Sequence, residues 1–257
     1  MNPAVAISDA WVLRDTAVVN PELQFFCLPH AGGGASAFSS WRGKLGPRVE
    51  ICAIQLPGRE SRITERPLDH MEPVVANLAE ALLPHIRVPY ILFGHSVGAL
   101  ISFEVARRMR SHGHAGPRAI FVAGSRAPDR PCSAPPVYHL PDHEFLERVA
   151  GMQGIPGELM EEREILDILL PALRADFTID DTYRFQPGNA LDCSVYAFGG
   201  LDDPDVSDED LEAWKHQTTG KFSLRMLPGN HFFLRSERAT LLKFLFEDIR
   251  DCIDYSA

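Results

Sequence analysis

Short apolar runs alternate with amphipathic stretches over most of this chain, and this alternation limits the possible folds more than any other feature. A continuous apolar run of four to eight residues is typical of a strand buried on both faces, whereas apolar residues three and four apart indicate a helix. Their alternation predicts βαβ units around a mostly parallel sheet, with helices on both faces. The predicted strands are residues 23–29, 49–58, 90–94, 118–124, 191–200 and 222–229, and the predicted helices are residues 36–45, 72–86, 98–113, 207–218 and 236–252.

The alternation stops between residues 126 and 189. This stretch opens with the proline-rich sequence RAPDRPCSAPPVYHLP and continues with two helical patterns, at 142–152 and 162–185. We therefore predict a single α/β domain over residues 1–257, with 126–189 inserted in it as a helical segment. Ligands of such folds bind beyond the carboxyl ends of the parallel strands. An insertion at this place is expected to lie over those ends and to act as a lid.

Composition excludes several classes of function. With 257 residues, 45% of them hydrophobic, the chain can bury a sizeable core. Its formal net charge of −10 argues against general nucleic-acid binding and against an anionic membrane surface as a partner. No run approaches the ~20 apolar residues that a membrane span needs. The first residues lack the basic region and long apolar stretch of a secretory signal, so a cytoplasmic protein is expected.

The cysteines and histidines give no sign of a metal site or of a disulfide framework. The five cysteines are odd in number and scattered, without a C-x-x-C motif, which is typical of reduced thiols in the cytoplasm. The tight histidine pair at 112–114 has no carboxylate or cysteine at ligand spacing, so no bound metal is expected. The cysteines are Cys27, Cys52, Cys132, Cys193 and Cys252.

Three arginines cluster in the segment PGRESRITERP: Arg59, Arg62 and Arg66. Because glutamates are interspersed among them, the favoured interpretation is a solvated loop. The alternative is a local basic patch on an otherwise acidic protein.

The segment FGHSVGA at 93–99 contains the pattern G-x-S-x-G, which chance alone supplies about 0.1 times in a chain of this length when glycine is near ~7% of residues. Its context is more specific than the pattern. A predicted strand ends at Gly94 and a predicted helix begins at Gly98, so Ser96 lies on a strand-to-helix turn. A serine on such a turn is the nucleophile elbow, with glycines where the strand and helix backbones pass closely. Ser96 is therefore the predicted nucleophile.

A serine hydroxyl needs a base to take its proton, and on this type of sheet the acid and then the base follow the nucleophile at later strand ends. His231, in LPGNHFFL, follows the predicted strand at 222–229 and is the predicted base. The other histidines considered fit surface or packing positions better. They are His112, His114, His139, His143 and His216.

The acid is expected from AFGGLDDPDVSDED, directly after the strand at 191–200. Asp203 is favoured because Pro204 holds the preceding residue in an extended conformation and so fixes its direction. Asp202 is the next candidate, and Asp129, one strand earlier, stays open as an alternative. Asp205 and Asp208 also compete in this loop.

Acyl transfer also needs hydrogen-bond donors for the oxyanion. One predicted donor is the backbone N–H of Val97, the residue after the nucleophile. The other is the N–H of Ala31 in LPHAGGGAS, because glycines there let the backbone approach a ligand closely. A phosphate-binding loop is excluded because no G-K-[ST] follows these glycines.

Taken together, six segments resemble the type II thioesterases, the free-standing editing enzymes of polyketide and nonribosomal peptide synthesis. The resemblance covers roughly residues 24–245, and it implies an α/β-hydrolase fold with a helical lid. Matching motifs place the nucleophile at Ser96, the acid at Asp203, the base at His231 and the oxyanion donors at Ala31 and Val97. A methionine is common in the family at the position of Val97. The segments are FFCLPHAGGGASAFSSW, AIQLPGRESR, LFGHSVGAL, LLPALRADF, AFGGLDDPDV and LPGNHFFL.

The resemblance implies hydrolysis of acyl thioesters on the phosphopantetheine arm of acyl or peptidyl carrier proteins, through an acyl-serine intermediate. It implies no cofactor, because the substrate carries the phosphopantetheine, and a monomer is expected. Since these carrier proteins are acidic, the candidates for a docking patch are the arginines at 59–66 and Arg126. A small-molecule carboxylesterase or an acyltransferase with the same triad remains an alternative, as does a binding protein without catalysis.

Overall fold

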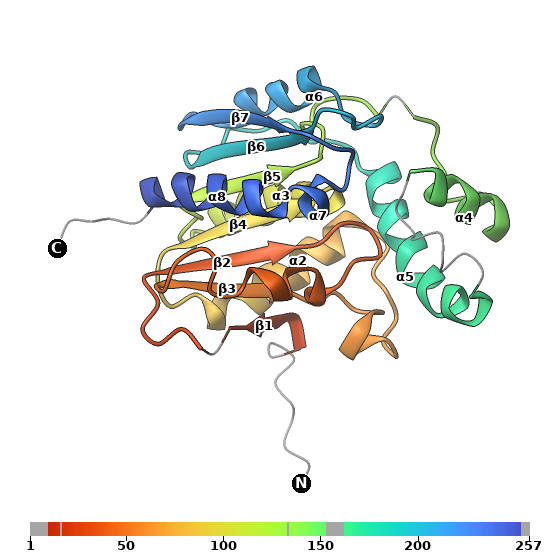
Figure 1. The fold of residues 1–257 in the computed structure, drawn as a ribbon, viewed down its shortest axis with the longest axis horizontal. Coiled ribbons are helices and arrows are strands. Elements are labelled where there is room, and N and C mark those ends of the chain that lie inside the picture. Colours follow the sequence, from red (N-terminus) through yellow and green to blue (C-terminus); the bar gives the residue numbers. More distant parts are fainter. Residues whose placement is uncertain (1–9, 16, 133, 153–161, 253–257) are drawn as a thin grey trace, which may run out of the picture.

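The computed structural model describes residues 10–15, 17–132, 134–152 and 162–252. In this part of the chain seven strands form one sheet, in the order β1-β3-β2-β4-β5-β6-β7 (Figure 1). Neighbouring strands are parallel throughout, except that β1 pairs antiparallel with β3. The predicted α/β class with a mostly parallel sheet is confirmed. The strands are β1 Val12–Arg14, β2 Leu23–Leu28, β3 Val49–Ile54, β4 Tyr90–His95, β5 Ala119–Ala123, β6 Ser194–Gly200 and β7 Phe222–Leu227.

Each predicted strand is present, and the inner ones are fully buried because helices cover both of their faces. The edge strand β1 is absent from the sequence-based prediction. Its three residues are too few to show a periodicity, and it ends in a charged residue. That residue, Arg14, is held by an ion pair with Glu50 of β3 at 2.8 Å, a contact between distant parts of the chain.

Helices pack on both faces of the sheet. On one face, α2 and α3 contribute apolar side chains such as Leu78 and Phe103 to the larger core. On the other face, α8 contributes Leu241 and Leu245. Figure 1 shows α8 in front of the sheet and α2 and α3 behind it. The α-helices are α2 Met71–Leu82, α3 Val97–Ser111, α4 Asp142–Gly151, α5 Arg163–Thr182, α6 Asp208–Glu212, α7 Phe233–Ser236 and α8 Arg238–Ile249.

The predicted helix at 36–45 is instead a 3₁₀-helix, Ala35–Trp41. Its two buried aromatic side chains, Phe38 and Trp41, are three residues apart, which places them on one face of a helix with three residues per turn. The predicted helix at 236–252 is divided into α7, α8 and a terminal 3₁₀ turn, Arg250–Cys252.

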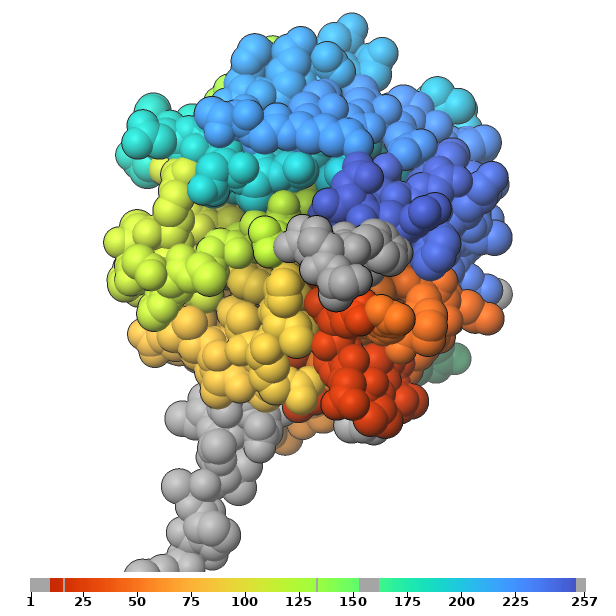
Figure 2. Space-filling view, turned by 90° about the vertical axis from the view of Figure 1, so that its left-hand side faces the viewer, coloured from red at the N-terminus to blue at the C-terminus, as the bar shows by residue number. Residues whose placement is uncertain are grey.

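Helices α4 and α5 lie together beyond one end of the sheet, on the side to which the arrowhead of β2 points (Figure 1). They form a small core of their own with buried Phe145, Val149, Leu166 and Leu173. Figure 2 views the molecule from the opposite end, where early segments lie below and late segments above, in accordance with the strand order. Among the described residues, no helix is both long and apolar enough to cross a membrane.

Candidate active site

Ser96 occupies the single-residue turn between β4 and α3. Its backbone has φ 56° and ψ −126°, a conformation that costs a non-glycine residue on the order of 1–3 kcal/mol. The neighbouring strand β5 holds the turn in place, because the N–H of Ser96 donates to the carbonyl of Ala123 at 2.8 Å. The predicted strand-to-helix turn is therefore present, and its hydrogen bond to the sheet maintains the strained conformation of Ser96.

The two glycines of the motif are required by the close approach of the backbones. A Cβ atom at Gly94 would lie 2.2 Å from the carbonyl oxygen of Gly98. A Cβ atom at Gly98 would lie 2.5 Å from the carbonyl oxygen of Pro29 and 2.7 Å from that of Leu28. The second contact also shows that the loop after β2 passes directly against the first turn of α3.

His231 and Asp203 are paired beside this turn. His231 follows β7 and Asp203 follows β6, and Nδ1 of His231 lies 2.8 Å from Oδ2 of Asp203. Since a carboxylate only accepts hydrogen bonds, Nδ1 carries a proton, which in the neutral ring leaves the lone pair of Nε2 available. The Asp203 side chain is fully buried, and its other oxygen accepts the N–H of Asp205 at 2.9 Å. The carboxylate is thus fixed from both sides.

The structure brings Asp203, rather than Asp202 or Asp129, to the imidazole. Asp202 is exposed, and its N–H donates to the carbonyl of Gly229 at 2.9 Å. This hydrogen bond connects the loop after β6 to the loop after β7. Asp205 borders the cavity described below, and burial raises the pKa of its carboxyl group.

Two further histidines, His95 and His30, lie beside His231, and neither is among the residues predicted from the sequence. The Nε2 of His95 lies 2.9 Å from the carbonyl oxygen of His231, so this nitrogen must be the donor. His30 stacks edge-on against His95, with ring centroids 5.2 Å apart. Burial lowers the pKa of His95 well below its ordinary value and that of His30 to about 3, so both rings are neutral. Their positions in the sequence could have indicated them, because His95 directly precedes Ser96 and His30 directly precedes Ala31.

The two predicted oxyanion donors come from the first turn of α3 and from the loop after β2. Val97 is the first residue of α3, where backbone N–H groups have no acceptor within the helix. Ala31 lies in the loop after β2, which is folded into a turn by the bond from the Gly33 N–H to the carbonyl of His30 at 2.9 Å. Ala31 and Ser96 border the same cavity.

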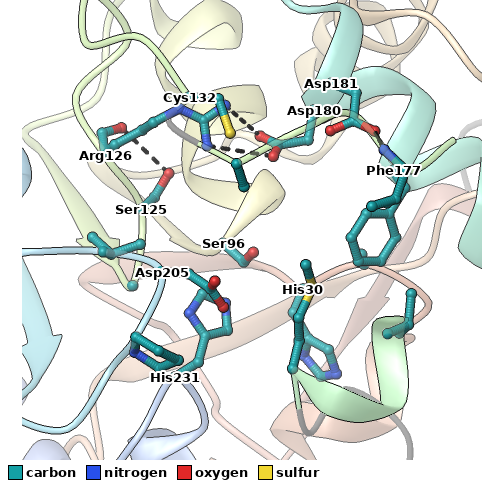
Figure 3. A pocket seen from close by; sticks show the side chains of 18 of the residues that line it. His30, Ser96, Ser125, Arg126, Cys132, Phe177, Asp180, Asp181, Asp205 and His231 are labelled. Atoms are coloured by element: carbon teal, nitrogen blue, oxygen red, sulfur yellow. Dashed lines mark hydrogen bonds and ion pairs between the residues drawn. The ribbon is translucent and has the colours of Figure 1, made fainter. Parts of the chain in front are cut away.

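This cavity has a volume of about 230 Å³ and extends from the predicted site residues to helices α4 and α5 (Figure 3). Ser96 and His231 lie at one side, and Phe177 of α5 lies across from them. Arg126 and Asp180 form an ion pair at 3.4 Å in the wall. The lining in the described part of the chain is His30, Ala31, Ser96, Gly124, Ser125, Arg126, Pro131, Cys132, Ala134, Pro135, Val137, Val149, Met152, Leu173, Phe177, Asp180, Asp181, Pro204, Asp205, Val206, Asp210, His231 and Phe232.

Two of the three arginines at 59–66 are buried, so for these two both predicted interpretations, a solvated loop and an exposed basic patch, are wrong. Arg59 is 3% exposed and pairs with Asp176 of α5, and Arg62 is 6% exposed and pairs with Glu65. Their guanidinium groups are used inside the molecule and cannot form an exposed docking patch. Arg126 is also partly buried in its ion pair.

Chemically, the arrangement suits nucleophilic attack by a serine on an acyl group. A hydroxyl on a strained turn, an imidazole oriented by a buried carboxylate and the loop residue Ala31 border one cavity, and N–H groups without an acceptor in the helix begin α3 directly after the hydroxyl. Among the described residues, no group of three or more histidine, cysteine, aspartate or glutamate side chains is arranged to hold a metal ion.

Residues 23–250 match the thioesterase domain family. The chain is 40% identical to gramicidin S biosynthesis protein GrsT of Aneurinibacillus migulanus, over 93% of this chain and 94% of the relative. Among solved structures, the RedJ thioesterase from the prodiginine pathway in Streptomyces coelicolor is 41% identical with a TM-score of 0.84, covering 88% of this chain and 90% of RedJ. BorB, a type II thioesterase from the borrelidin cluster, is 34% identical with a TM-score of 0.85, covering 93% and 97%.

Proposed function

The chain belongs to the thioesterase family, and within it to the type II editing thioesterases of nonribosomal peptide and polyketide pathways; on this premise we propose that Ser96, Asp203 and His231 form its catalytic triad. The observation that carries the proposal is the 2.8 Å bond between His231 and Asp203 beside the strained turn of Ser96. Type II thioesterases act on substrates bound to carrier proteins. The acyl thioester of a phosphopantetheine arm is therefore the proposed substrate.

In the proposed acylation, the Ser96 hydroxyl attacks the thioester carbonyl and its proton passes to Nε2 of His231. Asp203 holds the ring in the tautomer with Nδ1 protonated and stabilises the imidazolium that forms. The tetrahedral intermediate collapses as the C–S bond breaks, and the pantetheine sulfur takes the proton from Nε2 of His231, so the thiol departs and the imidazole is neutral again. A thiol has a pKa near ~8.5, far below that of an alcohol, so its departure needs little help from His231 as an acid.

Deacylation depends more strongly on the imidazole. Water is a poor nucleophile, so His231 must take a proton from it as it attacks the acyl-Ser96 carbonyl. The same ring then returns the proton to the Ser96 oxygen when the free acid leaves. In both steps the oxyanion is proposed to accept hydrogen bonds from the N–H groups of Val97 and Ala31, each such donor being worth about 2.7–4 kcal/mol.

The insertion at 126–189 is proposed to be the lid of the acyl site. The support is that α4 and α5 contribute Val149, Leu173 and Phe177 to the wall of the cavity that contains Ser96. We further propose that the enzyme works in the cytoplasm and is a monomer. Size-exclusion chromatography with light scattering tests the oligomeric state.

Steady-state hydrolysis by purified variants tests the assignment of the triad. Ser96→Ala should reduce kcat on an acyl-carrier protein by at least about 10⁴-fold, and His231→Ala by a similar factor, because the triad acts as a unit. Asp203→Asn should cost about 10⁴-fold, since the amide can stabilise the wrong tautomer. Asp202→Asn is the matched control and should retain activity. Wild-type turnover by Ser96→Ala would refute the assignment.

The choice of substrate separates the thioesterase from an esterase with the same triad. An acyl-carrier protein, the corresponding acyl N-acetylcysteamine thioester and a p-nitrophenyl ester are compared at equal concentration. We expect the highest kcat/KM for the acyl-carrier protein. Equal kcat/KM for the p-nitrophenyl ester would contradict the proposed carrier substrate.

A further inference from the structure

A buried ion pair joins helix α5 to the segment after β3 and contacts the loop that carries the proposed oxyanion donor. Arg59 donates two hydrogen bonds to Asp176, from Nη1 at 2.5 Å and from Nη2 at 3.0 Å. The two side chains are 3% and 1% exposed. Residues 59 and 176 come from separate parts of the chain, so the pair forms only when α5 is docked on the sheet domain.

Both members of the pair also bind the backbone of the loop after β2. Oδ2 of Asp176 accepts the N–H of Gly32 at 2.7 Å, and Nη1 of Arg59 donates to the carbonyl of Gly33 at 3.3 Å. Gln55 extends the same support, because its amide group donates to the Arg59 carbonyl and accepts the Ala35 N–H, both at 2.9 Å. The peptide groups that follow Ala31 are therefore held by charged and amide side chains.

Helix α5 also packs against this loop one turn before Asp176. A Cβ atom at Gly32 would lie 2.8 Å from Cδ1 of Leu173, and the φ of Gly32 is +73°. This loop conformation thus depends on glycine and leaves no gap beneath α5.

The pair does not belong to the acyl-binding surface. From α5, the cavity lining in the described part of the chain includes Leu173, Phe177 and Asp180, but neither Asp176 nor Arg59. A buried ion pair is weak evidence for stability, because apolar side chains of similar volume often serve as well. The contacts that apolar side chains could not replace are those to Gly32 and Gly33.

We propose that Arg59 and Asp176 are positioning residues that hold the Ala31 N–H in the oxyanion hole, so that α5 is part of the catalytic scaffold as well as a wall of the acyl site. This inference rests on the proposed function, in which Ala31 is an oxyanion donor. Neither residue touches the reacting atoms. Their effect passes through the peptide groups of Gly32 and Gly33.

Asp176→Ala and the double variant Arg59→Met/Asp176→Leu test this role on an acyl N-acetylcysteamine thioester. Removing one oxyanion donor costs about 10²–10³ in kcat, so a displaced donor should lower kcat by about 10- to 100-fold. KM should change by less than about threefold, because the donor acts mainly on the transition state. An alkylboronic acid forms a tetrahedral anionic adduct with a serine hydroxyl. Its inhibition constant should increase by about the same factor as kcat decreases.

The double variant separates positioning from stability. Its apolar pair should restore the melting temperature relative to Asp176→Ala, but it cannot bind the Gly32 N–H, so kcat should stay low. The matched control is Asp248→Ala, which breaks the Arg225–Asp248 pair at 2.6 Å between β7 and α8. That variant should lower the melting temperature and leave kcat and boronic acid inhibition unchanged.

Wild-type kcat in Asp176→Ala, or recovery of kcat together with the melting temperature in the double variant, would overturn the positioning role. Ser96→Ala, assayed alongside, keeps this outcome distinct from failure of the proposed function. If Ser96→Ala is inactive while Asp176→Ala is fully active, the triad stands and only the positioning role is refuted. If Ser96→Ala is fully active, the proposed function itself is refuted.

Discussion

At Ser96 the backbone conformation is maintained by its neighbours on both sides. The φ of 56° is unfavourable for any side chain with a Cβ atom, and a bond to Ala123 together with the tight contact of Gly94 and Gly98 leaves no room for relaxation. The strain therefore cannot be released by a small shift of the helix. The turn presents the Ser96 hydroxyl at the carboxyl end of the central strand β4, where the cavity begins.

Gly98→Ala tests this packing directly. The added Cβ atom would meet the Pro29 carbonyl oxygen at 2.5 Å, and the contact is with backbone that cannot rotate away. We expect a loss of about 3 kcal/mol or more in the free energy of unfolding, at the upper end for overpacking, measured by urea denaturation. The control is Gly116→Ala, where an added Cβ atom meets nothing within 4 Å. Equal stability of the two variants would show that the backbones are not in fixed contact.

The neutral histidines beside His231 give the protein a characteristic dependence of stability on pH. Burial lowers the folded-state pKa of His30 to about 3, while the unfolded chain has a pKa near ~6.5. Between these values the unfolded state binds a proton that the folded state does not. The free energy of unfolding should therefore be unaffected above pH ~6.5 and decrease below it, by up to about 1.4 kcal/mol per pH unit for one such group.

His30→Phe keeps an aromatic ring against His95 and Phe232 but removes the titrating group. Chemical denaturation between pH 7 and 5 should show a shallower decrease in stability for this variant than for the wild type. His114→Phe, at an exposed position, controls for the general effect of the substitution. An unchanged slope in His30→Phe would mean that the His30 ring takes up protons equally in both states.

Local sequence patterns were enough to predict Ser96, His231 and Asp203 as candidates, because each directly follows a strand whose apolar run is plain. The supporting residues were beyond such reasoning. The partner of Arg59 is Asp176, 117 positions away, and the interspersed glutamates near Arg59 favoured an exposed loop instead. Ion pairs of this kind depend on how α5 docks, which no local period encodes.

At the scale of elements, α5 carries three different sets of contacts on one helix. Leu173 and Phe177 face the cavity, and Asp176 binds the loop after β2. Near its end, Asp181 accepts the N–H groups of Val137 and Tyr138 at 2.7 and 3.0 Å. The period of the sequence predicted this helix, but the assignment of its faces required the tertiary structure.

Phe177 is expected to limit the length or bulk of the acyl chain. Its ring lies across the cavity from Ser96 (Figure 3). It packs edge-on against Phe145 of α4, with centroids 5.4 Å apart. Phe177→Ala should enlarge the cavity and raise the ratio of kcat/KM for a long acyl thioester over that for acetyl by about tenfold or more. Phe246→Ala, on the exposed side of α8, is the control. An unchanged ratio would place the end of the acyl chain elsewhere.

At the scale of the whole molecule, the order of the sheet brings distant loops to one end. The proposed nucleophile follows the central strand β4, and the proposed acid and base follow β6 and β7 on one side of it. The loop after β2 approaches from the other side, and helices α4 and α5 lie beyond this end of the sheet (Figure 1). The sequence predicted the alternation that builds this frame. It missed β1, whose three residues add an antiparallel edge strand.

The net charge of −10 predicts how salt affects association with an acidic carrier protein, the proposed partner. Because Arg59 and Arg62 are used in internal ion pairs, they are not available to offset this charge on the surface. Repulsion between like net charges slows association and is screened by salt, since the Debye length falls from about 30 Å at 0.01 M to about 10 Å at 0.1 M.

We therefore expect kcat/KM for an acyl-carrier protein to rise by about two- to tenfold as NaCl increases from about 0.01 to 0.1 M. The uncharged acyl N-acetylcysteamine thioester, measured in the same buffers, reports any effect of salt on the chemistry itself and should change little. A decrease with salt for the carrier substrate alone would contradict this expectation. It would mean that other exposed cations form an attractive docking patch, whose local field exceeds that of the whole molecule.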